Sequence, residues 1–265
     1  SLWARVTRML VARSRFPLQA AQERIFQPAC YRGSCLPALP SKVSVHRYIV
    51  EHWSASLGMR SNLLPRRGRC IETGDGHYLR SYFVSWCTSQ LVLDKDATEA
   101  DMRVDLDLPW SSMWPGVQRF EGSFDFVVSI DVFEHLLRPT VAISNVNALL
   151  QMGGCIAWSA PLISIHHGVV GHYDDYHRFT VASARKILEC GGFHLQQLQG
   201  RGSLYSTVAN LVGLTAGDLL EAELEISCDG MKPGGCLYRT YFAVCALGCK
   251  VRNVSAASVT ECFQR

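Results

Sequence analysis

Charged side chains, long apolar runs and paired cysteine motifs are scarce or absent in this sequence. Asp, Glu, Lys and Arg make up 18% of the 265 residues and apolar residues make up 48%, against about a quarter charged in typical globular domains. A low charge content with many apolar residues excludes an intrinsically disordered chain. No uninterrupted apolar run approaches the roughly 18 residues of a membrane helix, so we expect no membrane span.

The cysteines lack the spacings of a metal site. There are 11 of them, an odd number, with no Cys-x-x-Cys pair. The two close pairs, Cys30/Cys35 and Cys245/Cys249, have no histidine pair nearby, so we expect no structural zinc or other metal. Several of the others lie in apolar strand-like runs, where a free thiol packs as a small hydrophobe. We therefore expect reduced thiols in a reducing compartment, cytoplasmic or organellar.

Basic residues are concentrated at the front of the chain. Residues 1–69 hold 12 Lys/Arg and 2 Asp/Glu, a net charge of +10, whereas the remainder has a net charge of −7. Residues 1–22 contain four arginines and no acid, which resembles an organelle transit peptide; the alternative is a basic extension of a truncated gene model. No basic–aromatic module follows, so we expect no nucleic-acid partner. We divide the chain into a basic extension with a linker and short helix (1–68), a globular domain (69–250) and a C-terminal tail (251–265).

From residue 69 onward, strand and helix signals alternate. Runs rich in β-branched and aromatic residues predict strands, and apolar residues at helical spacing predict helices. The expected strands are 69–73, 89–94, 101–105, 124–130, 155–160, 193–199 and 237–247. The expected helices are 42–58, 77–86, 133–151, 181–191 and a stretch near 203–225. Alternation of this kind predicts an α/β three-layer sandwich around a mainly parallel sheet.

A glycine turn follows the first expected strand. Gly74 and Gly76 come directly after that strand, and ligands of open α/β sheets bind at the carboxyl ends of the strands. Asp94 ends the second strand, 20 residues after Gly74, and Asp105 ends the third. An acid in the position of Asp94 suits the two ribose hydroxyls of a nucleoside. Together with Glu72, these acids at three successive strand ends predict an adenosine-binding site.

The surroundings of the turn distinguish between two adenosine cofactors. The dinucleotide fingerprint G-x-G-x-x-G needs a small residue where this chain has Leu79. Pyrophosphate prefers basic or neutral surroundings at a helix N-terminus, whereas Glu72 and Asp75 make this turn acidic. A cationic sulfonium without phosphates suits an acidic turn, so the residues favour S-adenosylmethionine over NAD(P). The Tyr-x-x-x-Lys pair of many NAD(P)-dependent oxidoreductases is also absent.

Four segments together resemble class I S-adenosylmethionine-dependent methyltransferases. The turn at 72–76 (ETGDG) is similar to the first motif of that family, and residues 123–135 (SFDFVVSIDVFEH) are similar to its fourth-strand motif. Residues 149–154 (LLQMGG) resemble its L-K-P-G-G helix end, with Met152 in place of the proline. Residues 175–180 (DYHRFT) resemble the D-Y-x-R-F-T segment of a subgroup whose members often accompany glycan-modifying enzymes. The resemblance covers nearly all of the expected domain.

The resemblance implies a Rossmann-like fold, with a mainly parallel seven-stranded sheet whose last strand is antiparallel. It also implies S-adenosylmethionine as cofactor, bound by Glu72, Gly74, Gly76, Asp94, Asp105, Ile130 and Asp131. Asp94 would hold the ribose hydroxyls, and Asp105 would lie near the adenine amino group. Ile130 and Asp131 would lie beside the transferred methyl group. Tyr78 stands where the family has a third glycine, which narrows the space over the cofactor.

Each of these acids has a structural alternative. In the alternative interpretation, Glu72 or Asp94 would cap the following helix or turn instead of binding the cofactor, a common use of carboxylates. Asp101 or Asp107 is as well placed in the sequence as Asp105.

The candidate catalytic residues follow the fourth and fifth strands. Methyl transfer relies mainly on alignment in a dry pocket, and it needs a general base only if the acceptor is a hydroxyl or a protonated amine. The candidate bases are His135, His166, His167, His172, Asp174, Asp175 and His177. We select His135 as the base, with a hydrogen-bonded scaffold role as its alternative. We select Asp175 and Arg178 as a clamp on a polar substrate, with an internal pair that fixes the loop as the alternative.

The predicted function is therefore transfer of a methyl group from S-adenosylmethionine to a small-molecule or glycan-like acceptor. Two alternatives stay open. The first is an NAD(P)-dependent oxidoreductase, and the second is a non-catalytic module that binds a cofactor or a partner.

Overall fold

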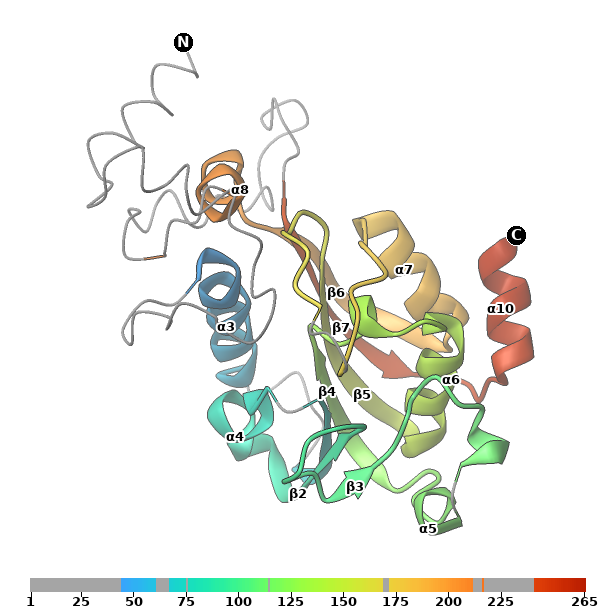
Figure 1. Cartoon of the computed structure of the whole chain (residues 1–265). Coiled ribbons are helices and arrows are strands. Elements are labelled where there is room, and N and C mark those ends of the chain that lie inside the picture. The colour runs from blue at the N-terminus through green and yellow to red at the C-terminus, as the bar shows by residue number, and fades with distance from the viewer. Residues whose placement is uncertain are drawn as a thin grey trace. The chain divides into compact units, whose positions relative to one another are not determined.

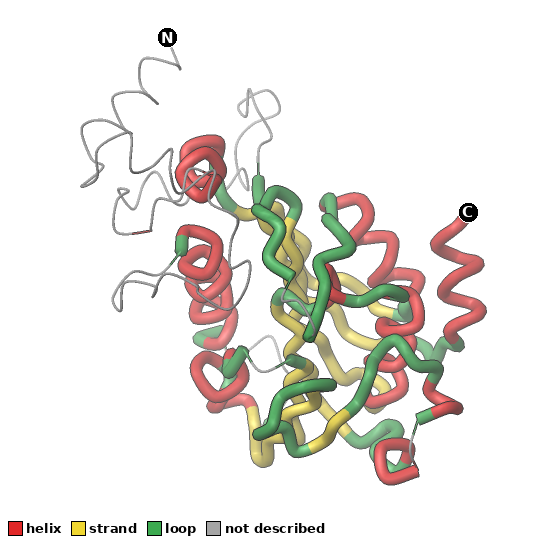
Figure 2. Tube along the Cα trace, in the orientation of Figure 1, coloured by secondary structure: helices red, strands yellow, loops and turns green. Residues whose placement is uncertain are grey.

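The computed structural model describes residues 44–60, 67–74, 76–113, 115–168, 172–211, 216 and 241–265 (Figures 1 and 2). The predicted linker, Asp75 and most of the basic extension lie outside the described residues. Contacts divide the chain into two compact units. The described part of the smaller unit comprises residues 44–50, 163–167, 200–211, 216 and 241–243, and the larger unit comprises all other described residues.

Seven strands form one sheet in the order β3-β2-β1-β4-β5-β7-β6 (Figure 1). Their bounds are β1 Gly68–Thr73, β2 Cys87–Asp94, β3 Met102–Arg103, β4 Phe124–Ile130, β5 Leu150–Pro161, β6 Phe193–Arg201 and β7 Ala243–Lys250. The first five strands pair in parallel with their neighbours among themselves, and β7 runs antiparallel to β5 and β6. The predicted α/β fold with a mainly parallel seven-stranded sheet and an antiparallel last strand is confirmed.

Helices cover both faces of the sheet. Their bounds are α3 Val45–Gly58, α4 Tyr78–Tyr82, α5 Pro115–Gln118, α6 Pro139–Leu149, α7 Val181–Cys190, α8 Leu204–Leu211 and α10 Ala256–Gln264, with 3₁₀ turns η1 Val84–Trp86, η2 Trp110–Ser112 and η3 Phe133–His135. Within the larger unit, α6, α7 and α10 lie on one face and α4 lies on the other (Figure 2). Among the described helices, none combines the length and apolar composition needed to cross a membrane.

Strand β4 is buried on both faces, which explains its nearly continuous apolar sequence. All of its residues except Asp125 are buried, as expected of a central parallel strand covered on both sides. On the α4 side, the Phe126 ring packs against Phe83 and Trp86, with ring centroids 5.3 and 4.9 Å apart. On the α6 side, Ile143 is fully buried. The hydrophobic core therefore has its centre at the strand that leads into the candidate site.

The predicted helix 133–151 is wrong in its bounds. Only η3 and α6 are helical there, and β5 already begins at Leu150. Pro139 occupies the first turn of α6, where its fixed φ and missing N–H are tolerated, whereas one turn further inside a helix it would break the hydrogen-bond ladder. The predicted C-terminal tail contains α10, which packs on α6 and α7.

The prediction of reduced thiols is wrong for six cysteines. Disulfides join Cys70 to Cys87, Cys155 to Cys249 and Cys190 to Cys262, and Cys245 is buried. The partners are 17, 94 and 72 residues apart in sequence, and only the strand order and the packing of α10 on α7 bring them together. The predicted reducing compartment depended on reduced thiols, so it loses that support and stays a prediction.

Lys250, the last residue of β7, is a buried cation that lies against the C-terminal end of α6. Its side chain is almost inaccessible, and Nζ donates hydrogen bonds of 2.7 Å to the backbone oxygens of Asn147 and Leu150. Asn147 lies in the last turn of α6 and Leu150 is its C-cap residue. Backbone oxygens at the C-terminal end of a helix lack helical partners, and a cation is favoured there. Burial nevertheless lowers the pKa of Lys250, and the charge of Glu121 opposes this effect.

We expect the stability of the protein to rise with pH below the ordinary lysine pKa of 10.5, and Lys250→Met to remove this rise. The folded protein binds the Lys250 proton less tightly than the unfolded chain does. Between the lowered pKa and 10.5 the unfolded chain therefore carries more protons, and the free energy of unfolding increases with pH, by about 1.4 kcal/mol per unit of pKa difference. Urea unfolding of both proteins from about pH 8 to about pH 10.5 measures how the free energy of unfolding depends on pH. Lys95→Met is the control, because Lys95 is exposed. A wild-type profile as flat as that of Lys250→Met would contradict the prediction.

Candidate functional site

The predicted cofactor residues lie at neighbouring strand ends. The last residue of β1, Thr73, pairs in register with Leu93 of β2 on one side and with Ser129 of β4 on the other. Because the three strands are parallel, their carboxyl ends form one edge of the sheet. Asp94 and Ile130 are the next residues of β2 and β4. The strand order therefore brings together residues that are far apart in sequence.

The turn after β1 requires glycine at Gly74. Its φ is +83°, and its N–H donates a 2.8 Å hydrogen bond to the backbone oxygen of Leu93. A Cβ atom at this position would lie 2.9 Å from Cγ2 of Val132. Glycine is the residue that adopts this backbone and lets it approach β2 and the segment after β4 so closely. Gly76 is also crowded, because a Cβ there would lie 2.7 Å from the Tyr78 ring.

Glu72 caps α4, the helix that follows β1. Its side chain is buried, and its two carboxylate oxygens accept hydrogen bonds from the backbone N–H groups of Tyr78, at 2.8 Å, and Leu79, at 3.1 Å. His77, the N-cap residue of α4, has a left-handed φ of 59° and provides no side-chain cap. Glu72 therefore satisfies N–H groups that would otherwise lack partners, which is the capping alternative of the sequence analysis.

Asp94 forms a tight turn with one carboxylate oxygen. Its Oδ1 accepts hydrogen bonds of 2.7 Å from the backbone N–H groups of Asp96 and Ala97. Its Oδ2 has no hydrogen-bond donor among the residues that the structure describes. The side chain is half-buried, so Asp94 is held rigidly while one oxygen stays available for a ligand hydroxyl.

Asp105 is the best placed of the three acids around β3. Asp101 Oδ2 accepts the N–H of Val92, and both oxygens of Asp107 accept N–H groups of residues 137 and 138, just before α6. Those two carboxylates therefore serve the scaffold. Asp105 uses Oδ1 to accept the N–H of Asp107 and has Oδ2 3.8 Å from Nζ of Lys95. Its half-buried position makes it the remaining candidate for the adenine side.

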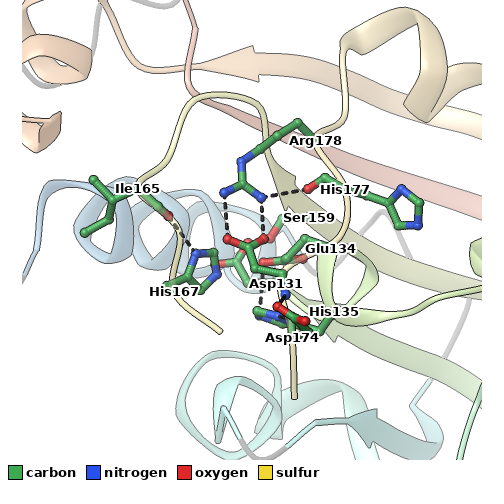
Figure 3. Close-up of polar contacts among 10 residues, drawn as sticks. Asp131, Glu134, His135, Ser159, Ile165, His167, Asp174, His177 and Arg178 are labelled. Atoms are coloured by element: carbon green, nitrogen blue, oxygen red, sulfur yellow. Dashed lines mark hydrogen bonds and ion pairs between the residues drawn. The ribbon is translucent and has the colours of Figure 1, made fainter. Parts of the chain in front are cut away.

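Asp131, directly after β4, has an unusual backbone conformation. Its φ is +54°, which is uncommon for a residue other than glycine and frequent at functional sites. Its N–H donates to the backbone oxygen of Ser159, and its Oδ1 accepts a 2.7 Å hydrogen bond from Ser159 Oγ (Figure 3). Ser159 is a buried residue of β5 that the sequence analysis missed. Nothing in its sequence context marks it, because its contact depends on the pairing of β4 with β5.

His135 is oriented by a backbone carbonyl. Its Nδ1 lies 2.6 Å from the backbone oxygen of Asp174 (Figure 3). Because a carbonyl only accepts, Nδ1 carries the proton, and Nε2 is the basic nitrogen of the neutral ring. Nε2 lies 3.7 Å from Oε1 of the fully buried Glu134. The ring also meets the Tyr173 ring edge-on, with centroids 4.6 Å apart.

Asp175 and Arg178 pair with each other. Arg178 Nη1 and Nη2 bind the two carboxylate oxygens of Asp175, and Nη1 also donates to the backbone oxygen of His177. The Asp175 side chain is fully inaccessible and that of Arg178 is 29% exposed. The hydrogen bond to Asp175 and the charges of Asp175 and Glu134 raise the pKa of Arg178 despite its burial. This geometry matches the internal pair rather than a clamp on substrate.

The loop that contains this pair is anchored at several points. The backbone N–H groups of Tyr176 and His177 donate to the backbone oxygen of Glu134. The backbone N–H of Phe179 donates to the backbone oxygen of Pro161. Phe179 is buried edge-on against Trp158. Tyr173 and Tyr176, in contrast, are 46% and 49% exposed. The loop therefore holds two exposed aromatic side chains on a fixed backbone, and the sequence analysis assigned a binding role to neither.

The remaining candidate histidines are His166, His167, His172 and His177. His166 and His167 belong to the smaller unit, where Nδ1 of His167 lies 3.1 Å from the backbone oxygen of Ile165. His166 and His172 are exposed.

Comparison with known proteins identifies similar folds. No protein-family model matches the sequence, and no curated protein matches it. Solved structures do match, and several of them are S-adenosylmethionine-dependent methyltransferases. A chain from the complex of the Haloferax volcanii Trm112 methyltransferase activator is 16% identical with a TM-score of 0.47, and the match covers 76% of this chain and 91% of that one.

Two further matches are of the same kind. An S-adenosylmethionine-dependent methyltransferase from Mesorhizobium loti is 16% identical with a TM-score of 0.44, covering 76% of this chain and 100% of that one. The 1,6-didemethyltoxoflavin-N1-methyltransferase of Burkholderia thailandensis is 12% identical with a TM-score of 0.45, covering 77% and 79%. At these identities and TM-scores, the matches are not evidence about activity or ligand.

Proposed function

We propose that this protein is an S-adenosylmethionine-dependent methyltransferase. The observation that carries the proposal is the turn after β1. The hydrogen bond from Gly74 N–H to the backbone oxygen of Leu93 fixes the turn one residue away from Asp94. A glycine turn beside an acid with one available oxygen suits a nucleoside whose ribose hydroxyls approach the backbone closely.

The turn fits a sulfonium cofactor better than a dinucleotide. In a dinucleotide site, the backbone N–H groups at the start of the first helix bind the pyrophosphate. Here the N–H groups of Tyr78 and Leu79 already donate to the buried carboxylate of Glu72. A phosphate would have to displace an anion that is buried beside it, whereas a cation is attracted to it. This contact argues against the NAD(P)-dependent alternative.

The residues at the strand ends have distinct roles in this proposal. Gly74 and Gly76 allow close approach of the cofactor, and Glu72 shapes the turn rather than contacting ligand. Asp94 Oδ2 accepts from a ribose hydroxyl, and Asp105 lies on the adenine side. Ile130 and Asp131 border the reacting end, where the bound cofactor supplies an electrophilic methyl group.

We further propose that His135 is the general base and that the acceptor is a hydroxyl-bearing small molecule or glycan-like compound. The Asp174 carbonyl holds His135 in the tautomer whose Nε2 accepts a proton. The Asp175–Arg178 pair is a positioning pair, since it fixes the loop that carries Asp174. The exposed rings of Tyr173 and Tyr176 suit a ring-shaped acceptor. The excess of acids after residue 69 disfavours a nucleic-acid acceptor.

We expect Asp94→Ala to weaken S-adenosylmethionine binding by roughly 10-fold to 150-fold, because a hydrogen bond from ligand to a carboxylate contributes about 1.5–3 kcal/mol. Calorimetric titration with S-adenosylmethionine, its demethylated product and NADH measures this. Asp96→Ala is the matched control, since Asp96 is exposed and contributes only its N–H to the turn.

The outcomes separate the alternatives. Binding of NADH but not S-adenosylmethionine would overturn the proposed function. Unchanged S-adenosylmethionine affinity in Asp94→Ala would overturn the assigned site. Normal binding without transfer of a labelled methyl group to any acceptor in a cell extract would favour the non-catalytic module.

A further inference from the structure

A cationic hollow lies against α7 and α10, and a disulfide forms part of its wall. The hollow has a volume of about 430 Å³ and is lined by α7, by the segment after β7 and by α10. Both Cys190, the last residue of α7, and Cys262 of α10 line it. All of its lining residues belong to the larger unit, and none of them takes part in the proposed methyl transfer.

The charge of the hollow is positive. Lys186, Arg252 and Arg265 line it together with one acid, Glu261. Arg265 forms an ion pair with Glu261, and Arg252 donates a hydrogen bond to the backbone oxygen of Glu189. The carboxylate of Glu189 pairs with Arg185 instead, and Lys186 has no ion-pair partner among the described residues. An anion entering the hollow therefore meets two cations, Lys186 and Arg252, that form no ion pair with an acid among the described residues.

One cysteine of this disulfide is half-buried and the other is buried. Cys262 is half-buried, whereas Cys190 is 2% exposed. Both cysteines of the Cys70–Cys87 disulfide are buried, at 0% and 5% exposed. The Cys155–Cys249 disulfide also joins a buried cysteine to a half-buried one, but neither of its residues lines the hollow. Thiol–disulfide exchange requires a thiolate to reach one sulfur along the S–S axis, and a cationic setting attracts thiolates and stabilises the thiolate that leaves.

We propose that Cys190–Cys262 is a thiol–disulfide exchange site for a small anionic thiol such as glutathione. The thiolate of the incoming thiol attacks Sγ of Cys262 and forms a mixed disulfide. The Cys190–Cys262 bond breaks, and its electron pair leaves on Sγ of Cys190, which takes a proton from water. A second thiolate then attacks the outer sulfur of the mixed disulfide, so that the small-molecule disulfide is released and Cys262 becomes a thiol. Two thiols are oxidised for each disulfide reduced.

The test compares thiols of different charge on the intact protein. Glutathione and uncharged 2-mercaptoethanol are applied at equal thiolate concentration and low ionic strength, and alkylation with peptide mass spectrometry follows each disulfide. Cys190–Cys262 should open before the other two disulfides. Glutathione should open it about tenfold faster than 2-mercaptoethanol, and added salt should remove this advantage. A glutathione adduct should be found on Cys262.

Charge variants make the test specific. The double variant Lys186→Gln/Arg252→Gln should bring the rates for the two thiols to near equality. Arg119→Gln, which removes a cation that stacks on Phe120 and does not line the hollow, should leave the advantage unchanged. Earlier opening of Cys70–Cys87 or Cys155–Cys249, or equal rates for the two thiols in the wild type, would overturn the proposal. So would an unchanged glutathione advantage in the double variant.

Discussion

His135→Asn should lower kcat for methyl transfer by about 10²-fold to 10⁴-fold, the usual contribution of a positioned general base, and leave S-adenosylmethionine affinity unchanged. The Asn side-chain amide takes the place of Nδ1 and keeps a donor for the Asp174 carbonyl. What the substitution removes is Nε2, the nitrogen that accepts the proton. The measurement is single-turnover transfer of labelled methyl to an acceptor on which the wild type is active, with calorimetric titration of the cofactor in parallel.

A structural role for His135 would give a different result. If the ring only anchored the loop to Asp174, His135→Asn would be nearly as active as the wild type, and His135→Ala would be the more damaged of the two. If it is the base, added imidazole should partly restore the rate of His135→Ala, because the shortened side chain leaves room for it. His194→Asn, at an exposed position of β6, controls for the substitution itself. Failure of imidazole rescue together with loss of cofactor affinity would identify a scaffold residue.

The sequence pattern predicted the bounds of the central strand β4 better than those of the edge strand β3. Strand β4 has the predicted bounds, because a strand buried on both faces is apolar along nearly its whole length and ends at turn residues. Strand β3 is shorter than predicted, with only two residues paired to β2. An edge strand has a partner on one side alone, so its sequence carries little apolar pattern. The last strand begins later than predicted, at Ala243.

The spacing of the acids predicted where they lie and not what they bind. Glycines and carboxylates at successive strand ends indicated one site, since parallel strands end at one edge. The bonds of each carboxylate depend on backbone N–H groups whose positions no spacing reveals. Glu72 was expected to line the cofactor and instead caps α4, while Asp94 keeps one oxygen available. The Asp175–Arg178 pair, three residues apart, was foreseen as an alternative because its contact is local.

The disulfides were missed for a related reason. Short cysteine spacings are informative only for metal sites and local loops. Cys155 and Cys249 meet because β7 pairs with β5, and Cys190 and Cys262 meet because α10 returns to α7. Both contacts depend on how the strands and helices are arranged in the folded protein, which the cysteine spacing does not reveal. The apolar runs around the cysteines correctly predicted burial and gave no information on oxidation.

Gly74→Val should weaken S-adenosylmethionine binding by roughly 100-fold or more, about 2.7 kcal/mol, and is the most direct test of the cofactor site. A side chain at position 74 would be unfavourable for two reasons, one in the backbone conformation and one in the packing. A φ of +83° disfavours any β-branched residue, and the new Cβ would lie 2.9 Å from Val132 Cγ2. The turn must therefore move, and its hydrogen bond to Leu93, which holds it beside Asp94, would be lost. Calorimetric titration measures the affinity, and thermal unfolding checks that the protein is folded.

Gly153→Val separates the two penalties. Gly153 has nearly the same φ, +80°, but a Cβ there meets no atom within 4 Å. The two variants therefore share the backbone strain, about 1–2 kcal/mol for a residue in this region, and only Gly74→Val disturbs the turn. We expect both to lose some stability and only Gly74→Val to lose the cofactor. Cofactor binding by Gly74→Val with wild-type affinity would contradict a site at this turn, because Gly74 holds the end of β1 against Leu93 of β2 and Val132 after β4.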